Sequence, residues 1–179
     1  MNDPVYETER LLLRPTSTED ASFILDLLNS PKWLRYIGDR NVKTPEQALE
    51  YIRVRFKMEY ERLGFSSFTV IRKTDLAKIG TCGLYDREGV DGIDIGFAFL
   101  PHYEGRGYAF EAAEKVMLLA FYEFGISELK AITSNYNLAS KKLLDKLGMT
   151  ASGKLTLPGD KEELLVYSIQ KPEQSAGLV

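Results

Sequence analysis

The chain has 179 residues, of which 44% are apolar, enough for one packed core and too few for a second full domain. Its 23 basic and 26 acidic residues are spread along the chain and give a formal net charge of −3, so we expect neither a nucleic-acid partner nor an anionic membrane surface. With one cysteine, one histidine, a polar amino terminus and no membrane-length apolar run, we expect no disulfide, no metal site and a cytoplasmic location.

The amino-terminal part of the chain predicts one strand and two helices. Residues 11–14 form the strand, and residues 17–29 repeat apolar side chains at helical spacing after residues that cap a helix. Residues 33–42 predict an exposed loop. The second helix spans residues 44–63, with a proline at its first position and a glycine just after its end.

The central part predicts a meander followed by a crossover. Strands at residues 65–72, 79–85 and 93–100 are separated by short turn-like segments, which predicts antiparallel pairing. A helix at residues 107–124 then leads to a strand at residues 129–133. This connection is long enough for a crossover, so the strands that it joins are expected to be parallel neighbours.

A helix at residues 137–147 and strands at residues 150–157 and 164–169 complete the pattern. We therefore predict one α/β domain over residues 1–170, with a mixed, mostly antiparallel sheet of about seven strands and about four flanking helices. Residues 171–179 predict a flexible tail.

The junction between the strand at residues 93–100 and the helix at residues 107–124 contains Gly105 and Gly107. A helix start offers unpaired backbone amides and a positive dipole end, and glycines remove side chains that would keep a diphosphate away. The same pattern also occurs in simple tight turns, so the junction alone leaves both interpretations open. The P-loop pattern and the third glycine of GxGxxG are missing, which argues against ATP and NAD.

The strand before this junction has one face of mostly small side chains. Asp94, Gly96, Ala98 and Leu100 alternate with isoleucine and phenylalanine residues that point the other way. The small face has room for a slim ligand, or it lets a helix pack closely on the sheet. The sequence leaves these two interpretations equal.

Residues 104–112, EGRGYAFEA, resemble the acetyl-CoA signature of the GNAT N-acetyltransferases, Gln/Arg-x-x-Gly-x-Gly/Ala. The resemblance is strongest to the RimJ/RimL-type ribosomal-protein N-terminal acetyltransferases and covers nearly the whole chain. Glu104 departs from the family pattern, so its carboxylate is expected to point away from the pyrophosphate. Further matching segments are ERLLLR at residues 9–14, IGF at 95–97, NLAS at 137–140 and LGM at 147–149.

The resemblance implies a GNAT fold and an enzyme that transfers an acetyl group from acetyl-CoA to a primary amine, by direct attack in a ternary complex. It implies that backbone amides of residues 104–109 bind the pyrophosphate, that residues 97–100 pair with the pantetheine arm, and that Asn137 hydrogen-bonds the same arm. The cofactor-binding residues that it implies are Phe97, Ala98, Phe99, Leu100, Glu104, Gly105, Arg106, Gly107, Tyr108, Ala109, Asn137 and Ser140.

The predicted catalytic residues are Ser140, which the resemblance implies, and Asp94, which lies on the small-residue face of its strand. Many family members place a tyrosine after the Asn-x-x-Ser motif as general acid, but leucines stand there, so Ser140 or water would protonate the departing thiolate. Asp94 is the first choice as base, ahead of Asp160 and Glu162, although such acids are more often solvated. Without the resemblance, Asn137 and Ser140 would be interpreted as helix caps.

Trp33, Tyr36 and the Gly-Asp-Arg turn at residues 38–40 lie where the family builds part of its acceptor groove, although the aromatic side chains there can equally be packing. His102 is expected at the rim of the site, and Cys82 is expected to be a buried, inert thiol. The expected acceptor is a small-molecule amine or a protein N-terminus, bound by a monomer or homodimer. The alternatives are a catalytically idle acyl-CoA-binding module, since the tyrosine is missing, and a non-enzymatic interaction domain.

Overall fold

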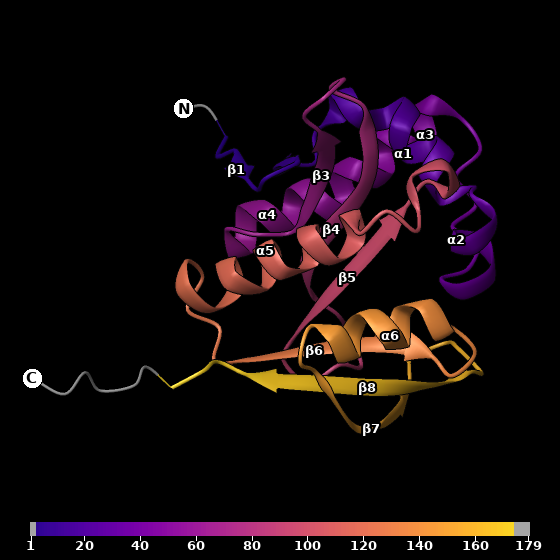
Figure 1. Cartoon of the computed structure of the whole chain (residues 1–179). Coiled ribbons are helices and arrows are strands. Elements are labelled where there is room, and N and C mark those ends of the chain that lie inside the picture. Colours follow the sequence, from indigo (N-terminus) through magenta and orange to yellow (C-terminus); the bar gives the residue numbers. More distant parts are fainter. Residues whose placement is uncertain (1–2, 174–179) are drawn as a thin grey trace, which may run out of the picture.

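The structure is a computed structural model that describes residues 3–173, so most of the predicted tail lies outside the described residues. One mixed sheet forms the centre of the molecule, with strand order β1-β2-β3-β4-β5-β6-β8-β7 (Figure 1). The strands are β1 (Tyr6–Glu7), β2 (Leu11–Pro15), β3 (Ser67–Arg72), β4 (Lys78–Asp86), β5 (Ile93–Phe99), β6 (Glu128–Ser134), β7 (Thr150–Thr156) and β8 (Glu163–Gln170).

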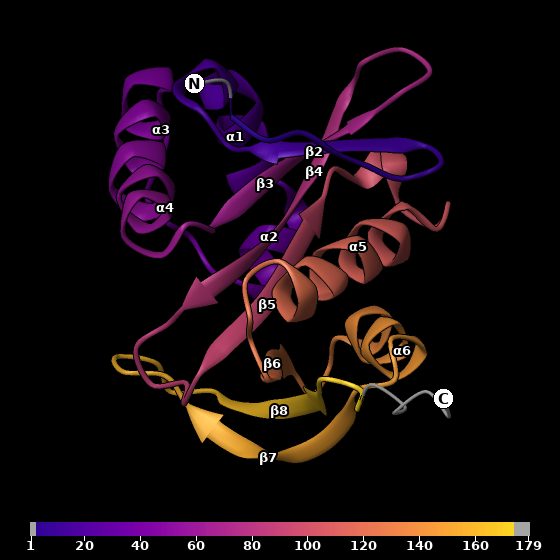
Figure 2. The same ribbon diagram turned by 90° about the vertical axis from the view of Figure 1, so that its left-hand side faces the viewer.

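Helices cover both faces of the sheet. Figure 2 shows α1, α3 and α4 on one side of the strands and α5 and α6 on the other. A π-helical turn, Arg53–Lys57, joins α3 to α4. The helices are α1 (Ala21–Leu28), α2 (Pro31–Tyr36), α3 (Pro45–Ile52), α4 (Met58–Leu63), α5 (Tyr108–Tyr122) and α6 (Leu138–Lys146).

Each face of the sheet has its own apolar core. Ile95 and Phe99 of β5 are buried among residues of α5 and the neighbouring strands. On the opposite face, Ala98 and Leu100 pack against the core formed by α1 and α3. The predicted division of this strand into two faces is therefore confirmed.

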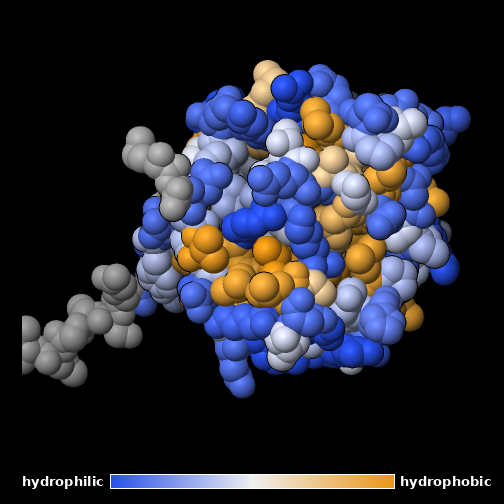
Figure 3. Space-filling model, turned by 90° about the horizontal axis from the view of Figure 1, so that it is seen from above, coloured by the Kyte–Doolittle hydropathy of each residue, from blue (hydrophilic) through white to orange (hydrophobic). Residues whose placement is uncertain are grey.

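Seen from above, the surface is mostly hydrophilic, with hydrophobic residues gathered in groups (Figure 3).

The mixed, mostly antiparallel α/β sheet confirms the predicted fold class, with two differences in count. The described chain has eight strands rather than about seven, because β1 has only two residues and is too short to produce an alternating pattern. If α3 and α4 are counted as one region because the π-helical turn joins them, the described chain has five helical regions rather than about four. The additional region is α2, because residues 33–42 are not simply an exposed loop. Pro31 begins α2, and Trp33 and Val42 are buried against α1 and α3.

One buried carboxylate connects α1 to three strands. Asp20, at the start of α1, pairs with Arg14 of β2 through two contacts of 2.8 Å and with Lys78 of β4 at 2.6 Å. It also accepts hydrogen bonds from the Thr69 hydroxyl of β3 and the Ser17 amide. The side chain of Asp20 is completely buried, so this network holds the first helix to the sheet.

The parallel pairing of β5 and β6 is confirmed, but it is short. β5 pairs with β4 along all of its seven residues, whereas it pairs with β6 only at Ile93 and Asp94. Beyond those residues the two strands diverge, which Figure 1 shows clearly. The edge of β5 from residue 95 onward therefore carries backbone groups that β6 does not pair.

None of the helices in residues 3–173 is long and apolar enough to cross a membrane.

Candidate active site

A cleft of about 1220 Å³ lies where β5 and β6 diverge. Residues 95–99 of β5 and residues 131–134 of β6 form its walls, and the loop before α5 and the first turns of α6 continue them. On its other side the cleft reaches α2, α3 and α4. The cleft thus brings together every segment in which the sequence predicts a site residue.

The glycine loop, residues 104–109, has the geometry of an anion site. Gly105 and Gly107 have φ angles of +71° and +80°, which L side chains rarely adopt, so glycine is needed at both positions. Within residues 3–173, the backbone amides from Gly105 to Phe110 donate to no protein acceptor, and the first amide to do so is that of Glu111, to Gly107. Six consecutive donors therefore remain available at the positive end of α5.

Arg10, which does not line the cleft, holds this loop in place. Its Nη1 donates to the Arg106 carbonyl at 3.0 Å, and its Nε donates to Glu111 at 2.7 Å. The Thr8 hydroxyl donates to the same carboxylate at 2.6 Å, and the Arg10 guanidinium lies 4.5 Å from the Tyr108 ring centroid. The loop is thus positioned by side chains of the amino-terminal segment, and its amides are left unoccupied.

The Glu104 carboxylate forms an ion pair with Lys32 of α2 at 2.5 Å. The pairing neutralises the one carboxylate of the loop and joins the loop to α2 across the cleft. A glutamate at this position is therefore compatible with a nearby anion.

Asn137 and Ser140 lie at the start of α6 and line the cleft. The side-chain oxygen of Asn137 accepts the Ser140 amide at 3.1 Å, so Asn137 does cap the helix. Capping uses only that oxygen: within the described chain, neither the Asn137 Nδ2 group nor the Ser140 hydroxyl has a protein partner. Both groups can therefore still bind a ligand in the cleft.

Asp94 lines the cleft but is only 1% exposed. Its two oxygens face Arg87, with contacts of 3.2 Å to Nε and 3.3 Å to Nη2. Burial raises the pKa of Asp94 above its usual value, against the opposing effect of Arg87. Asp160 and Glu162 also line the cleft and are exposed.

The small face of β5 makes room for a tyrosine ring. A Cβ atom at Gly96 would lie 3.0 Å from the Tyr85 ring, so Tyr85 occupies the space that the missing side chain leaves. Tyr85 itself lines the cleft, and burial raises the pKa of its hydroxyl. Gly96 therefore makes room for the Tyr85 ring rather than for a closely packed helix.

Both aromatic residues predicted at the acceptor side line the cleft. Trp33 is 9% exposed, and its buried Nε1 group has no hydrogen-bond partner in residues 3–173. Tyr36 is half-buried beneath the Arg35 guanidinium, 5.0 Å from the ring centroid. His102 is exposed beside Tyr103, outside the lining of the cleft. 

Cys82 is completely buried in the core, as predicted. Burial also raises the pKa of its thiol, so the reactive thiolate form is disfavoured.

Several cleft residues were missed by sequence reasoning. Glu59 of α4 lines the cleft, accepts the Asp86 amide at 3.0 Å, and has a pKa that burial raises. The only sequence signal for Glu59 was its position three residues after the buried Phe56, which on a regular helix would place it near the same face. The π-helical turn changes the rotation of the helix there, so spacing alone does not tell which residues of α4 face the sheet. Tyr51 and Arg55 also line the cleft and carried no motif, whereas Gly38 and Arg40 line it from the turn predicted at the acceptor side.

Comparison with known proteins identifies the family. Residues 10–150 match the acetyltransferase (GNAT) domain. The uncharacterized N-acetyltransferase YoaA of Bacillus subtilis is 30% identical over 176 residues, which cover 96% of this chain and 99% of YoaA.

Solved structures share the fold. An acetyltransferase from Agrobacterium tumefaciens has a TM-score of 0.80 and 24% identity, over 96% of each chain. The ribosomal-protein-S5-alanine acetyltransferase from Vibrio fischeri has a TM-score of 0.79 and 20% identity, over 96% of this chain and 98% of that one. These structures support the RimJ/RimL-type resemblance at the level of the fold. The chain therefore belongs to the GNAT family of acetyl-CoA-dependent N-acetyltransferases.

Proposed function

We propose that this enzyme transfers the acetyl group of acetyl-CoA to a primary amine by direct attack, with both substrates bound in the cleft. The observation that carries the proposal is the row of unoccupied amides from Gly105 to Phe110, which starts α5 beside the unpaired edge of β5. Such a row of amides can bind a pyrophosphate without a positively charged side chain. An extended edge beside it can pair with an amide-containing arm.

Ten of the twelve predicted cofactor-binding residues line the cleft, and Leu100 and Arg106 do not. Backbone amides of residues 105–109 bind the pyrophosphate, whereas the Glu104 amide, predicted with them, already donates to the Pro101 carbonyl at 3.3 Å. The edge of β5 at residues 97–99 pairs with the pantetheine amides, but Leu100 does not, because its amide donates to Ile79 and its carbonyl accepts from Tyr103. Asn137 donates its Nδ2 hydrogens to the same arm while its oxygen caps α6. The diverging strands then direct the thioester between β5 and β6, toward Ser140.

The remaining chemistry is proton transfer. An N-terminal α-amine has a pKa near 8 and a lysine amine near 10.4, so an α-amine needs only a weak or water-relayed base at neutral pH. Asp94 is the proposed base, acting through water because it is almost fully buried. Ser140 is the proposed donor to the departing thiolate, and Trp33 and Tyr36 are proposed to contact the acceptor on the opposite side of the cleft.

The experiment that tests this function measures CoA release with acetyl-CoA and a panel of amines: spermidine, amino acids, an aminoglycoside antibiotic and peptides with free N-termini. We expect turnover with at least one class. The alternative of an idle acyl-CoA-binding module predicts that CoA raises the melting temperature while no amine is acetylated. An unchanged melting temperature at millimolar acetyl-CoA would contradict both and leave the non-enzymatic interaction domain.

Ser140→Ala is expected to lower kcat by roughly 10- to 100-fold while changing acetyl-CoA affinity little, because a proton donor acts mainly in the transition state. Steady-state kinetics and a calorimetric titration measure the two quantities. Ser152→Ala, on the exposed strand β7, is the matched control and should leave both unchanged. Equal turnover by Ser140→Ala and the parent would remove Ser140 from the mechanism.

Asp94→Asn is expected to lower kcat/KM by roughly 100-fold or more and to remove the acid limb that belongs to the enzyme, while the limb set by deprotonation of the amine remains. A carboxylate base works only when deprotonated, so activity of the parent should rise with pH through the raised pKa of Asp94. Glu59→Gln is the comparison, because burial raises the pKa of Glu59 in the same cleft. If Glu59→Gln removes the limb and Asp94→Asn retains it, Glu59 is the base instead.

A further inference from the structure

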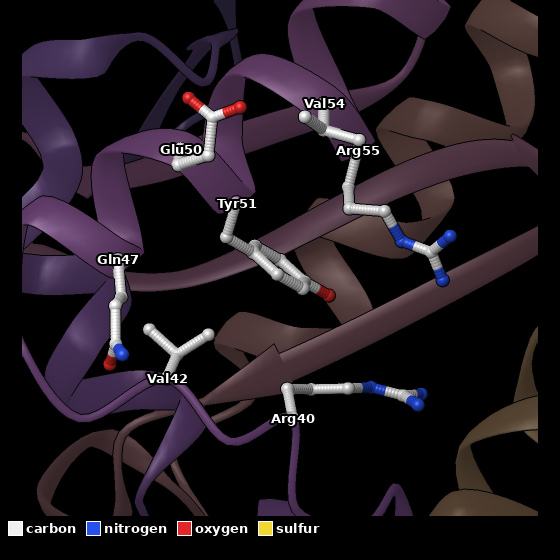
Figure 4. Close-up of a pocket in the computed structure, with 7 residues that line it drawn as sticks. All are labelled: Arg40, Val42, Gln47, Glu50, Tyr51, Val54 and Arg55. Atoms are coloured by element: carbon white, nitrogen blue, oxygen red, sulfur yellow. The ribbon is translucent and has the colours of Figure 1, made fainter.

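A side pocket of about 360 Å³ opens beside the acceptor end of the cleft. Four of its lining residues, Arg40, Tyr51, Val54 and Arg55, also line the cleft, so the two spaces adjoin. Figure 4 shows the hydroxyl of Tyr51 directed toward the side on which the guanidinium groups of Arg40 and Arg55 both lie. The side pocket thus presents two cations and a phenol toward the place where an acceptor enters.

Neither of these arginines has a counter-ion among the residues that the structure describes. Across residues 3–173, Arg40 and Arg55 form no ion pair and no side-chain hydrogen bond. Asp39, the acid next to Arg40, is engaged by Lys43 at 3.0 Å and by the Asn41 amide at 2.8 Å. The acid in the side pocket, Glu50, turns its carboxylate away from both guanidinium groups (Figure 4).

Three other cations of the cleft are paired: Lys32 with Glu104, Arg62 with Asp86 at 2.9 Å, and Arg87 with Asp94. Arg35, Lys142 and Lys146 also line the cleft without an ion pair in residues 3–173; Arg35 lies over the Tyr36 ring and Lys146 over the Phe110 ring. Arg40 and Arg55 differ from these in that both line the same side pocket, where two arginines without a counter-ion among residues 3–173 give a local positive potential in a chain of net charge −3.

The segment that carries Arg40 is well supported. The Asn29 side chain donates to the Val42 carbonyl at 2.8 Å, and Lys43 Nζ donates to the Asn29 side-chain oxygen at 2.8 Å. Gln47 accepts the Lys43 amide at 2.7 Å and completes a capping box with Thr44. Arg55 projects from the π-helical turn, where the helix is widened. Both arginines therefore extend from backbone that is already positioned.

We propose that the acceptor of this enzyme is an amine that also carries a carboxylate, and that Arg40 and Arg55 bind that carboxylate in the side pocket. The inference rests on the proposed acetyl transfer to an amine and names the class of that amine. Guanidinium groups match a carboxylate geometrically and bind it by paired, charge-assisted hydrogen bonds. Tyr51 adds a hydroxyl donor beside them, so the carboxylate is held while the amine extends along the cleft toward β5.

The test uses matched pairs of amines that differ only in charge. One arm compares ω-amino acids of two to six carbons with their carboxamides, and a second compares the peptide Ala-Glu-amide with Ala-Gln-amide. We expect kcat/KM to favour the carboxylate by roughly tenfold or more in at least one arm, and the preference to fall as ionic strength rises. The arm that shows the preference tells whether a small amino acid or an acidic peptide N-terminus supplies the carboxylate.

Variants assign the preference to the side pocket. Arg40→Gln and Arg55→Gln should each reduce the ratio of carboxylate to carboxamide kcat/KM, and the double variant should bring it close to one. Lys57→Gln is the matched control, since Lys57 lies on the same helical turn, outside both the side pocket and the cleft, and pairs with Glu61, which lines neither. A calorimetric titration of the same probes into the CoA-bound enzyme gives the corresponding ratio of affinities.

The outcomes separate this inference from the proposed function. Turnover of amines without a carboxylate preference would overturn the inference and leave acetyl transfer intact. Arginine-dependent binding of the carboxylate probes without any turnover would support the side pocket and contradict the proposed reaction. Equal turnover or equal binding of both members of every pair, or a preference that survives in the double variant, would overturn the inference.

Discussion

Gly107→Val is expected to weaken acetyl-CoA binding by roughly 100-fold, the equivalent of one or two charge-assisted hydrogen bonds. Gly107 has a φ of +80°, and a Cβ atom there would lie 3.3 Å from Arg10 Nη2. A branched side chain would therefore strain the turn, displace the arginine that holds the loop, and cover the amides that begin α5. Calorimetric titration with CoA measures the effect.

The control is Gly125→Val, just beyond the other end of α5. Gly125 has a φ of +69°, so valine strains the backbone there in a similar way, but the residue does not line the cleft. We expect Gly125→Val to lower the melting temperature and to keep the parent affinity for CoA. Parent affinity in Gly107→Val, or an equal loss in both variants, would mean that the glycine loop does not bind the pyrophosphate.

Asp20→Asn is expected to lower the free energy of unfolding by about 3–5 kcal/mol, because it removes the anion from a buried ion pair and leaves its cationic partner uncompensated. Arg14 and Lys78 both pair with this carboxylate. For a domain of this size we expect the melting temperature to fall by roughly 10 °C. Urea unfolding and thermal denaturation measure the change.

The same carboxylate predicts a pH dependence. Burial acts to raise the pKa of Asp20, but hydrogen bonds from Arg14, Lys78 and the Ser17 amide outweigh it and lower the pKa to about 2. A lowered pKa in the folded state stabilises the fold above the ordinary pKa of aspartate, near 4, and this contribution is lost as the pH falls toward 2. The difference in stability between parent and Asp20→Asn should therefore shrink over that range.

Asp75→Asn is the control for Asp20, since Asp75 also pairs with an arginine and also has a pKa near 2, but lies on the surface. Water screens exposed pairs, so this variant should unfold at nearly the parent temperature. An equal fall in melting temperature in the two variants would show that burial is not the reason for the contribution of Asp20 to stability.

The glycine loop was predictable because its signal is local. Left-handed φ angles at Gly105 and Gly107 and the start of a helix depend on residues within one turn of chain, and such dependence is visible in sequence. The parallel pairing of β5 with β6 followed equally from a local quantity, the length of the crossover between them.

Other features depend on contacts between distant parts of the chain. Tyr6–Glu7 becomes a strand only because β2 offers it a partner, and α2 is stabilised by the burial of Trp33 against α1 and α3. The divergence of β5 from β6, which opens the cleft, has no local sequence signal.

The sequence by itself therefore determined the order of the strands and helices other than β1 and α2, the two faces of β5 and the loop whose amides begin α5, because periodicity, turn residues and glycine conformations act over a few residues. Only the tertiary structure decided which charges find partners. It buries Asp20 beside Arg14 and Lys78, joins Glu104 to Lys32, and gives Arg40 and Arg55 no counter-ion within residues 3–173. Ion pairing depends on distance in space, and residues far apart in sequence reach each other only once the sheet has assembled.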